Sequence, residues 1–485
     1  MSTNGEDNKA SPSVSPGGSP SVSPGKVRTF TQFAAQWAQA APERSLVEHP
    51  QLGAGPLAQS ITVEGKQLPN RFAIHPMEGW DGTEQGAPSE WTLRRWEHFG
   101  RSGAALIWGG EAFAVVPEGR ANPRQLCRHP QTDNAATLAK LRAAVLKGRA
   151  QAGFTDQPFL LGLQLTHSGR FSVPLPGAPA PKPAQRNPLL EQRYPHHATA
   201  ALISDAELED LIGAYAATAK LAWNAGFDFV DLKACHGYLV HDLLGAHTRS
   251  GPFGGSFNNR TRFLRMLVEA VRAECMGLGI GVRLSAFDCV PHEADPATGI
   301  GRPMQHELPW RHSFGVNQQH PERADFSEPR ELVRALERMD VRLWNVSAGS
   351  PYWCPHVQRP ATFPPSDGYL PPRDPLCEVA ALFAAAEAVR SAATGITVVS
   401  TGATYLQEWL PHVVEAEIAR GATDFVGLGR MVLSDPDYPR RLLQENRIDR
   451  RLLCRTFSEC TSAPRAGLIS GCYPLDPDYK NLQGP

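Results

Sequence analysis

The sequence predicts an α/β protein folded as a (β/α)8 TIM barrel with extended loops on its catalytic face. Eight short apolar runs recur along the chain, and each is nearly continuously apolar, as in strands buried on both faces of a parallel sheet. Helical patterns lie between several of these runs. Eight strands are the number that closes this kind of barrel. The expected strands span residues 71–75, 104–108, 159–165, 227–232, 280–284, 341–346, 396–400 and 424–428.

The expected helices have recognisable ends. In the clearest, 205–224, Ser204 is a suitable N-cap, Glu207 stands three residues later as in a capping box, and Gly226 follows the C-terminus. Four more helices are expected among the strands, and a short one precedes the barrel. These helices span 29–39, 259–275, 329–339, 376–391 and 406–420.

The alternative for a chain of alternating strands and helices is an open, doubly wound sheet. A dinucleotide-binding sheet of that kind needs a glycine-rich turn after its first strand. Residues 74–79 do not supply one, and the glycine cluster at 277–281 precedes a strand instead of opening a helix. The sequence therefore favours the closed barrel.

The 485 residues would suffice for three average domains, but barrels with insertions exceed that size as single domains. We expect one barrel domain over 28–485, in which about 435–485 form a C-terminal extension. Residues 1–27 are rich in Ser, Pro and Gly, with too few apolar side chains to offset the entropy of ordering. They are expected to form a disordered tail.

The charges are balanced, with 48 Lys and Arg against 49 Asp and Glu and a formal net charge of -1. This balance gives no general attraction to nucleic acid or to an anionic membrane, so a small molecule is the expected partner. Nine irregularly spaced cysteines are typical of reduced thiols, and the start of the sequence has no apolar signal core. The expected location is the cytoplasm. The sequence does not decide whether the protein forms a homo-oligomer.

Polar residues directly after the expected strands are candidates for the active site, because such barrels carry it at the C-terminal ends of their strands. Gly402, Gly429 and Arg430 follow the seventh and eighth strands, where barrels commonly bind a phosphate. Taken singly, the glycines could equally serve to turn the chain. Together with the guanidinium they favour a phosphate site.

Two polar side chains fall inside apolar strands. Arg283 is costly to bury unless it meets an anion or a polar ring edge. Gln164 carries an amide that must be paired. A ligand or a structural ion pair would satisfy Arg283, and the ligand is favoured.

Four sequence blocks occur in a fixed order along the chain. The most diagnostic is Asp-Leu-Lys-Ala-Cys-His-Gly-Tyr-Leu at 231–239, continued by Arg249, 253–256 and 259–260. The other blocks are 70–77, 164–170 and 421–436. Together, over about residues 60–480, they resemble the old yellow enzyme family of flavin oxidoreductases.

The resemblance implies a barrel that binds FMN, accepts electrons from NADH or NADPH and reduces an activated carbon–carbon double bond of a small molecule. It also implies the cofactor contacts. Backbone at Pro76, Met77, Glu78 and Ala112 would face the flavin ring, Gln164 its pyrimidine edge and Arg283 its N1 and O2 side, while Gly402, Gly429 and Arg430 would hold the phosphate.

For the substrate, the family pairs a His with a second His or Asn that binds the electron-withdrawing oxygen. Here His236 is the second of these residues, Lys233 replaces the first, and Tyr238 stands where the family has its proton donor. Hydride addition builds an enolate, so fixed donors stabilise its oxygen while an acid protonates the α-carbon. Lys233 could supply that stabilisation or select a carboxylate-bearing substrate. Glu78, if ionised near the flavin, would disfavour its anionic reduced form.

Larger relatives bind a four-iron cluster through four cysteines. Cys460 and Cys472 keep the last spacing of that motif, but Leu453 and Thr456 stand at the two earlier positions, and Cys454 is displaced by one residue. No iron–sulfur cluster or other metal is expected. The extra nucleotide-binding domains of those relatives are not expected after residue 485 either.

The expected activity is that of an FMN-dependent ene-reductase. A flavin dehydrogenase or demethylase acting on C–N or C–H bonds is the alternative among enzymes. A flavin-binding sensor or scaffold without turnover is the alternative of another class. The alignment of Tyr238 with His236 argues against it, because a passive binder has no need of a proton donor beside an oxygen ligand.

Overall fold

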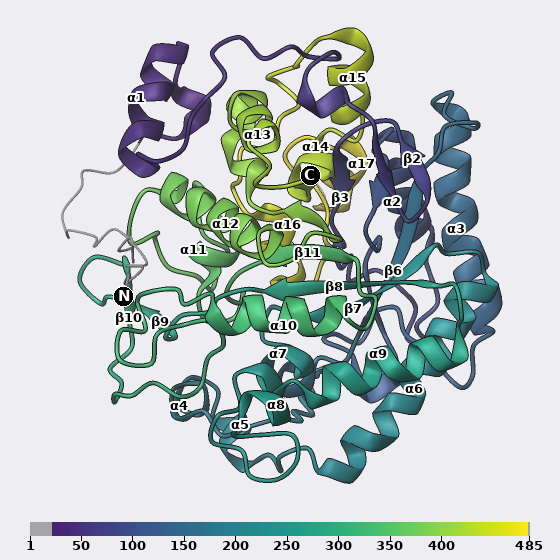
Figure 1. The fold of residues 1–485 in the computed structure, drawn as a ribbon, viewed down its shortest axis with the longest axis vertical. Helices are drawn as coiled ribbons and strands as arrows, with labels where there is room; N and C mark the ends of the chain where they lie inside the picture. Colours follow the sequence, from purple (N-terminus) through teal and green to yellow (C-terminus); the bar gives the residue numbers. More distant parts are fainter. Residues whose placement is uncertain (1–21, 484–485) are drawn as a thin grey trace, which may run out of the picture.

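Eight parallel strands close into a barrel in the computed structural model, which describes residues 22–483 (Figure 1). Each of them overlaps one of the eight predicted runs, and their ends differ from the prediction by a few residues. The predicted fold class is confirmed. The barrel strands are β3 (Phe72–Ile74), β4 (Leu106–Ile107), β6 (Leu160–Thr166), β7 (Phe229–Ala234), β8 (Gly279–Ser285), β11 (Leu343–Ser347), β12 (Thr397–Ser400) and β13 (Phe425–Leu428).

The sheet closes because β3 pairs on both sides. Phe72 lies opposite Val426 of β13, and Ala73 lies opposite Leu106 of β4, which in turn pairs with β6. A ninth strand that the sequence did not reveal, β5 (Ala112–Ala114), continues the pairing with β6 beyond the end of β4. The chain turns between β4 and β5 at Gly110, where φ is 57° and a Cβ would lie 2.2 Å from the Trp96 ring.

Helices surround the barrel, as the labels in Figure 1 show. The main ones are α2 (Glu90–Arg101), α3 (Asn134–Gln151), α6 (Asp205–Asn224), α9 (Arg262–Glu274), α10 (Ser327–Glu337), α12 (Pro375–Arg390), α13 (Leu410–Ala419) and α15 (Tyr438–Glu445). Helix α6 has the predicted bounds, and Ser204 and Glu207 form the predicted capping box. The short helix ahead of the barrel, α1 (Phe30–Ala40), packs against α12.

Two predicted helices are divided. The segment predicted at 259–275 forms α8 (Phe257–Arg260) and α9, and the segment predicted at 406–420 begins as the 3-10 helix η5 (Ala403–Trp409) before α13. Gln407 has a φ of 54°, outside the helical region, and Pro411 lies in the first turn of α13. Proline fits only the first turn of a helix, so the α-helix starts there.

Apolar side chains close the N-terminal end of the barrel. The hairpin of β1 (Ile61–Val63) and β2 (Lys66–Leu68) places Val63 and Leu68 in a cluster with Trp108 and Phe229. A second, larger cluster fills the space between the strands and the helices. The polar residues of the strands therefore have their free space at the opposite, C-terminal end.

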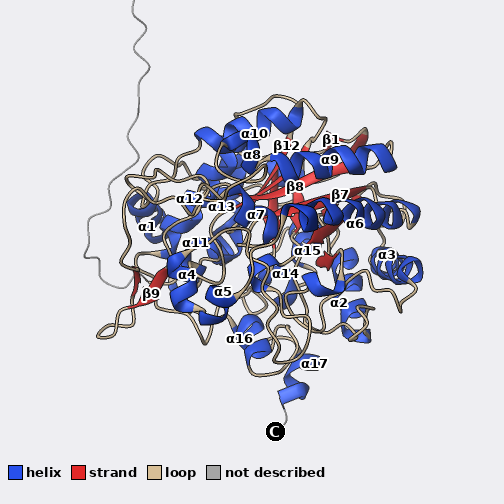
Figure 2. Ribbon diagram, turned by 90° about the horizontal axis from the view of Figure 1, so that it is seen from below, coloured by secondary structure: helices blue, strands red, loops and turns tan. Residues whose placement is uncertain are grey.

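Long insertions and the C-terminal extension carry the remaining elements. Figure 2 shows α16 and α17 beyond one end of the barrel, and the Ser470 backbone N–H there donates to Gly79 O at 2.7 Å. The shorter elements are η2 (Pro56–Ala58), η3 (Pro117–Gly119), η4 (Gly169–Phe171), α4 (Pro188–Arg193), α5 (Pro195–Thr199), α7 (Leu239–Leu244), β9 (His292–Ala294), β10 (Gly301–Pro303), α11 (Pro355–Gln358), α14 (Arg430–Ser434), α16 (Glu459–Arg465), α17 (Pro477–Lys480) and η6 (Asn481–Gln483).

Most of the predicted N-terminal tail, residues 1–21, lies outside the described residues. The rest of it contacts the barrel domain: η1 (Pro24–Lys26) accepts a hydrogen bond at Pro24 O from Trp409 Nε1 at 3.1 Å, and Val27 is buried. The packed chain therefore starts a few residues before the predicted boundary at 28.

No helix within 22–483 is both long enough and apolar enough to cross a membrane.

We expect His167 to make the protein sensitive to acid. Its buried imidazole accepts a hydrogen bond at Nδ1 from the Gly169 N–H, and burial lowers its pKa to about 4. The unfolded chain, with an ordinary histidine pKa near 6.5, binds this proton first, so stability falls as the pH drops from about 6.5 toward 4.

Urea unfolding at pH 7 and pH 5 measures this effect. His167→Asn keeps an acceptor but does not titrate, so wild type should lose about 1–2 kcal/mol more stability than the variant between the two pH values. His49→Asn, at a residue with an exposed ring, is the control and should behave as wild type. Equal losses in wild type and His167→Asn would contradict the assignment.

Candidate active site

A polar layer crosses the inside of the barrel near the C-terminal ends of β6, β7 and β8. Asp231 accepts from Gln164 Nε2 at 2.5 Å with one carboxylate oxygen and from the Arg283 backbone N–H at 2.6 Å with the other. Burial raises the pKa of Asp231 to about 6, although the Arg283 charge acts against the rise. The structure thus brings two of the predicted residues together around a carboxylate that the prediction did not include.

The Arg283 guanidinium reaches across the barrel to the end of β3. Its Nη1 donates to Pro76 O at 3.4 Å, and its buried Nε has no hydrogen-bond partner. Burial lowers its pKa below the ordinary value for arginine. A buried N–H without an acceptor is costly, so this edge of the layer fits a ligand that carries acceptor atoms.

The ends of the first and last barrel strands lie side by side. At this position the protein backbone was predicted to contact the ligand. The Met77 N–H donates to Gly110 O at 2.9 Å, and a Cβ on Gly429 would lie 3.6 Å from Met77 Sδ with no nearer neighbour. Gly402, after β12, has a φ of 99°, which L-residues with a side chain rarely adopt. Ala112 is buried in β5, and its carbonyl already accepts from Gln125 Nε2 at 3.0 Å.

Two guanidinium groups lie beside this junction without carboxylate partners. Arg430 donates from Nη2 to Pro360 O at 2.7 Å, and Arg359 donates from Nη1 to Thr461 Oγ1. The other terminal nitrogen of each, Arg430 Nη1 and Arg359 Nη2, is buried and unpartnered, and no Asp or Glu oxygen among residues 22–483 lies within 4.0 Å of either group.

Burial and the nearness of the two cations both act against their charged forms. Burial and the charge of Arg430 lower the pKa of Arg359 to about 10, and burial also lowers the pKa of Arg430. Two cations with free donors and no acid partner fit a phosphate dianion, which guanidinium groups bind with strong, charge-assisted hydrogen bonds. Arg430 was predicted for this role, and Arg359 was not.

A second cluster joins the end of β3 to the end of β7. Lys233 Nζ lies 3.1 Å from Glu78 Oε1, and the Tyr238 hydroxyl donates to the same oxygen at 3.2 Å. The Lys233 ammonium also lies 3.7 Å from the centre of the Tyr238 ring, and the hydroxyl of Tyr352 lies 3.1 Å from that of Tyr238. Three predicted residues, Glu78, Lys233 and Tyr238, are therefore in direct contact.

The environment of Tyr238 keeps its phenol protonated. Burial is the largest cause, and the Glu78 carboxylate adds to it, so the pKa of Tyr238 lies well above its ordinary value of 10.0. A phenol that keeps its proton at neutral pH can act as a general acid once a proton acceptor forms beside it.

The hydrogen-bond partners of His236 lie outside this cluster. Its Nε2 is 3.2 Å from Ser347 Oγ and 3.3 Å from Gln358 Nε2, and its backbone N–H donates to Ser285 Oγ at 3.1 Å. Burial and the nearby charges of Arg283 and Lys233 hold its pKa well below the ordinary histidine value. The imidazole is neutral, so it acts as a hydrogen-bonding group and not as a cation.

A buried ion cluster braces the loop that carries Pro76, Met77 and Glu78. Arg95 of α2 donates to Asp81 Oδ2 and to Glu111 Oε2, each at 2.5 Å, and Thr92 Oγ1 donates to Asp81 Oδ1 at 2.8 Å. A Cβ on Gly79 would lie 2.0 Å from the Arg95 guanidinium. The loop therefore follows a path that only glycine permits over a fixed cation.

Sequence reasoning missed several residues of the site. Asp231 interrupts an apolar strand in the same way as Arg283, so the same reasoning could have found it. Tyr352 and Arg359 lie on a long loop after β11, and their sequence pattern carries no signal of the site.

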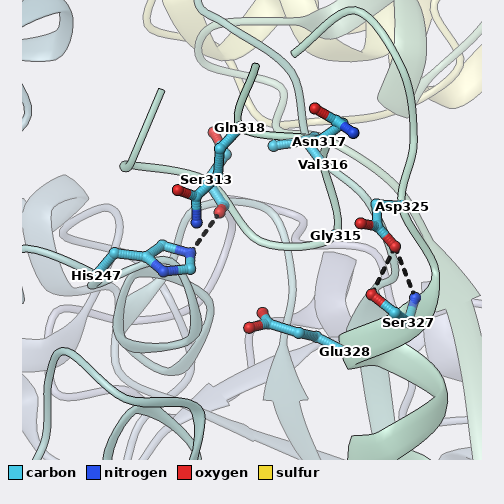
Figure 3. Close-up of a pocket in the computed structure, with 9 residues that line it drawn as sticks. All are labelled: His247, Ser313, Gly315, Val316, Asn317, Gln318, Asp325, Ser327 and Glu328. Carbon is cyan, nitrogen blue, oxygen red and sulfur yellow. Dashed lines mark hydrogen bonds between the residues drawn. The ribbon is translucent and has the colours of Figure 1, made fainter. Parts of the chain in front are cut away.

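Figure 3 shows a different cavity, of about 260 Å³, on the outside of the barrel near the start of α10. His247 points into it with Nε2 3.2 Å from Ser313 O, and Glu328 lies across from it. None of the predicted site residues lines this cavity. Its volume is below the about 300–1,000 Å³ that is usual for small-molecule sites, so it does not compete with the barrel mouth.

The C-terminal end of the barrel therefore combines the unpartnered Arg283 Nε, two guanidinium groups with unpartnered nitrogens and a phenol that keeps its proton. The model of the NADH:flavin oxidoreductase / NADH oxidase family matches residues 56–305, half of the chain. The chain belongs to that family. This confirms the predicted resemblance, and with it FMN and NAD(P)H as the cofactors that the family uses.

Curated relatives agree with this assignment. An NADPH dehydrogenase of Bacillus velezensis is 31% identical over 245 residues, which cover 50% of this chain and 66% of the relative. One of Geobacillus sp. is 30% identical over 241 residues, which cover 48% of this chain and 64% of the relative. An NADH oxidase of Thermoanaerobacter brockii is 25% identical over 423 residues, 82% of this chain and 54% of the relative. The chain thus spans about two thirds or less of these relatives.

Solved structures share the fold. Histamine dehydrogenase from Rhizobium sp. 4-9 superposes with a TM-score of 0.62 at 18% identity, covering 88% of this chain and 53% of that one. The old yellow enzyme homologue from Zymomonas mobilis superposes with a TM-score of 0.55 at 20% identity, covering 81% and 94%. At these identities the likeness supports the barrel and nothing finer.

The residues present fit FMN. The unpartnered Arg283 Nε suits the flavin N1 and O2 side that was predicted for Arg283, and the unpartnered nitrogens of Arg430 and Arg359 fit its phosphate. Cys454, Cys460 and Cys472 are not in the one group of three or more possible metal ligands found within 22–483. The expectation that no iron–sulfur cluster is bound stays a prediction.

Replacing Arg430 should weaken FMN binding. Arg430→Gln removes a charge-assisted contact of about 1.5–3 kcal/mol, so the dissociation constant of FMN should rise about 10- to 100-fold. Fluorescence titration of flavin-free protein with FMN measures this constant, and riboflavin, which lacks the phosphate, should bind both proteins equally.

Arg447→Gln is the matched control, because Arg447 is an exposed arginine paired with Glu445 away from the site. Its FMN affinity should equal that of wild type. If Arg430→Gln weakened riboflavin and FMN alike, Arg430 would not be a phosphate ligand.

Proposed function

We propose that this protein is an FMN-dependent ene-reductase, which reduces an activated carbon–carbon double bond of a small molecule at the expense of NADH or NADPH. The observation that supports this most is the contact of Lys233, Glu78 and Tyr238 at the barrel mouth. It combines a cation that can stabilise an enolate oxygen with an acid that can protonate the adjacent carbon.

Bound FMN would supply hydride transfer, and the protein residues would orient the substrate and manage its charge and protons. Arg283 would meet the flavin edge that becomes more negative on reduction. Its backbone N–H is bonded to Asp231, and its guanidinium reaches Pro76 O. The neutral His236 would bind the electron-withdrawing oxygen of the substrate without adding a second cation to the pocket.

Tyr238 would deliver the proton. Its hydroxyl donates to Glu78 and contacts the Tyr352 hydroxyl, which comes from the loop after β11. Glu78 orients the phenol, and Tyr352 offers a second hydroxyl through which Tyr238 can regain a proton. The proton that leaves this pair with the product would be replaced from solvent.

The same cluster weighs against an amine dehydrogenase or demethylase. A protonated amine would need an unpaired carboxylate, and the Glu78 carboxylate is already paired with Lys233 at 3.1 Å. The ammonium would also repel a cationic substrate. A neutral enone or an anionic enoate is compatible with it. A sensor or scaffold without turnover gains nothing from a phenol aimed into the pocket.

Anaerobic titration of the NAD(P)H-reduced protein distinguishes these functions. Enones or enoates should reoxidise the bound flavin, whereas iminium products of amine oxidation should not. Reoxidation by the iminium compounds alone would overturn the proposal in favour of the dehydrogenase. A reduced flavin that none of these compounds reoxidises would favour the sensor or scaffold.

Replacing the proton donor should affect only the second half-reaction. Tyr238→Phe should slow reoxidation by an enone about 10²- to 10⁴-fold, the usual contribution of a general acid, while flavin reduction by NAD(P)H stays near the wild-type rate. Stopped-flow absorbance of the flavin measures both steps.

Tyr215→Phe controls for loss of a buried hydroxyl, because Tyr215 is fully buried on α6 and outside the site. It should leave both rates unchanged. If Tyr238→Phe reoxidised as fast as wild type, Tyr238 would not be the proton donor.

Lys233 should determine the preference between anionic and neutral substrates. Lys233→Gln should raise KM for an enoate about 10-fold or more, because an ionic hydrogen bond of about 1.5–3 kcal/mol is lost, and should affect a neutral enone less. Steady-state kinetics with a matched enoate and enone measure the ratio.

Lys147→Gln is the control, since Lys147 is an exposed lysine paired with Glu97. It should not change the ratio of the two KM values. An equal loss for both substrates in Lys233→Gln would show that Lys233 does not read the carboxylate.

A further inference from the structure

Two loops at the C-terminal end of the barrel place Asp288, Cys289 and Cys354 together. Asp288 and Cys289 follow β8, and Cys354 precedes α11 in the loop after β11. One carboxylate oxygen and the two sulfurs all lie within 4.8 Å of one another, and the side chains of Asp288 and Cys354 are buried. None of these residues was assigned to the pocket described above.

The surroundings hold these three side chains in place. Trp353 Nε1 donates to Asp288 Oδ1 at 2.9 Å, and the Cys289 backbone N–H donates to the same oxygen at 2.8 Å. The Ser350 backbone N–H donates to Cys354 Sγ at 3.2 Å. Donors of this kind orient metal ligands in the outer coordination shell of many sites.

His292 stands next to the cluster in a suitable tautomer. Its Nδ1 lies 2.8 Å from the Val290 carbonyl, an acceptor only, so Nδ1 carries a proton and Nε2 is the nitrogen left to face Cys289. Its side chain hydrogen-bonds that of Cys289. A histidine whose second nitrogen donates to a backbone carbonyl is the usual arrangement for a metal ligand.

The Asp288 carboxylate has no Lys or Arg partner among the described residues. Among residues 22–483, the only basic group within 4.0 Å of the Asp288 carboxylate is His241 Nε2, at the limit of 4.0 Å. His241 accepts a hydrogen bond at Nδ1 from the Gly237 N–H, so its Nε2 is the nitrogen that faces Asp288. A cation placed between a buried carboxylate and two sulfurs is stabilised by all three groups.

We propose that Asp288, Cys289 and Cys354 bind a Zn²⁺ ion. The His292 ring lies outside this group of three and would shift toward the ion to become the fourth ligand. Two sulfurs, a carboxylate oxygen and an imidazole nitrogen match the ligands and the coordination number that zinc prefers. Mg²⁺ and Ca²⁺ prefer oxygen ligands, which the cluster does not supply in number. Binding forms two Zn–S bonds and releases the two thiol protons to solvent, with no change of oxidation state.

The ion would brace the roof of the barrel mouth. Trp353 joins Asp288 to the loop after β11, and the same loop carries Tyr352, beside Tyr238, and leads to Gln358, beside His236. Zinc would link this loop to the one after β8. The role is structural, so zinc binding should raise the unfolding temperature without being required for flavin reduction.

Zinc content of the flavin-loaded protein tests the proposal directly. Protein purified under reducing conditions is incubated with Zn²⁺, freed of loose metal by gel filtration and analysed by elemental mass spectrometry. Wild type should retain about one zinc per chain. Cys289→Ser and Cys354→Ser should retain almost none. Cys275→Ser, in which a buried cysteine at the opposite end of β8 is replaced, should retain as much as wild type.

Co²⁺ gives a second readout that does not depend on stoichiometry. Tetrahedral cobalt with thiolate ligands absorbs in the red, beyond the oxidised flavin bands, and this absorbance should appear in wild type and in Cys275→Ser only. Asp288→Asn keeps the acceptor for Trp353 Nε1 but loses the charge, and should weaken Zn²⁺ binding at least 10-fold. Its flavin content and circular dichroism show that it is folded.

Three results would overturn the proposal. The first is reduced wild-type protein that retains no zinc. The second is equal zinc content in wild type, Cys289→Ser and Cys354→Ser. The third is a Cys289–Cys354 disulfide in the untreated protein, found by peptide mapping, together with no zinc uptake after its reduction. That last result would assign the pair to thiol chemistry instead.

Discussion

The pairing of β3 with β13 is the constraint on which the rest of the structure depends. It joins residues some 350 positions apart in the sequence, with Phe72 opposite Val426 and Ile74 opposite Leu428. A closed sheet leaves no unpaired edge, and it directs every strand end to one rim. Only because of this closure does the Pro76–Glu78 backbone lie next to Gly429 and Arg430, which come from the two ends of the fold.

The closed barrel also determines where polar groups can be placed. Its N-terminal end is filled by Val63, Leu68, Trp108 and other apolar side chains, so charge is confined to the opposite end. There Asp231 and Arg283 are buried in neighbouring strands, at a desolvation cost that their contact only partly offsets. Such a layer does not improve stability over an apolar one. A polar ligand that bonds to the free donors of this layer would explain why the layer is not apolar.

Residues inside the strands could be predicted from the sequence, and residues in the long loops could not. Arg283 and Gln164 interrupt apolar runs, which identifies a buried polar group without knowledge of the fold. Gly402 and Arg430 directly follow strands, so the barrel geometry places them. Tyr352 and Arg359 lie in the segment between β11 and α12, whose path depends on contacts with distant parts of the chain, such as the bond of Arg359 to Thr461. No local pattern encodes such contacts.

Contacts between distant parts of the chain also explain why the fold differs from the prediction in two places. Strand β5 is defined by its pairing with β6, and three residues carry too little periodicity to reveal it. The division of the predicted helix at 406–420 follows from the backbone of Gln407, which packs beneath the N-terminal segment near Trp409 and Pro24. Both features arise from tertiary contacts that override local preference.

One aromatic contact couples the movable parts of the roof. The Tyr352 ring stacks on Phe171 with centroids 3.7 Å apart and planes within 7°, which joins the loop after β11 to the loop after β6. Neither loop can swing outward alone without separating two buried ring faces. The two insertions therefore brace each other, and a substitution in either ring should loosen both.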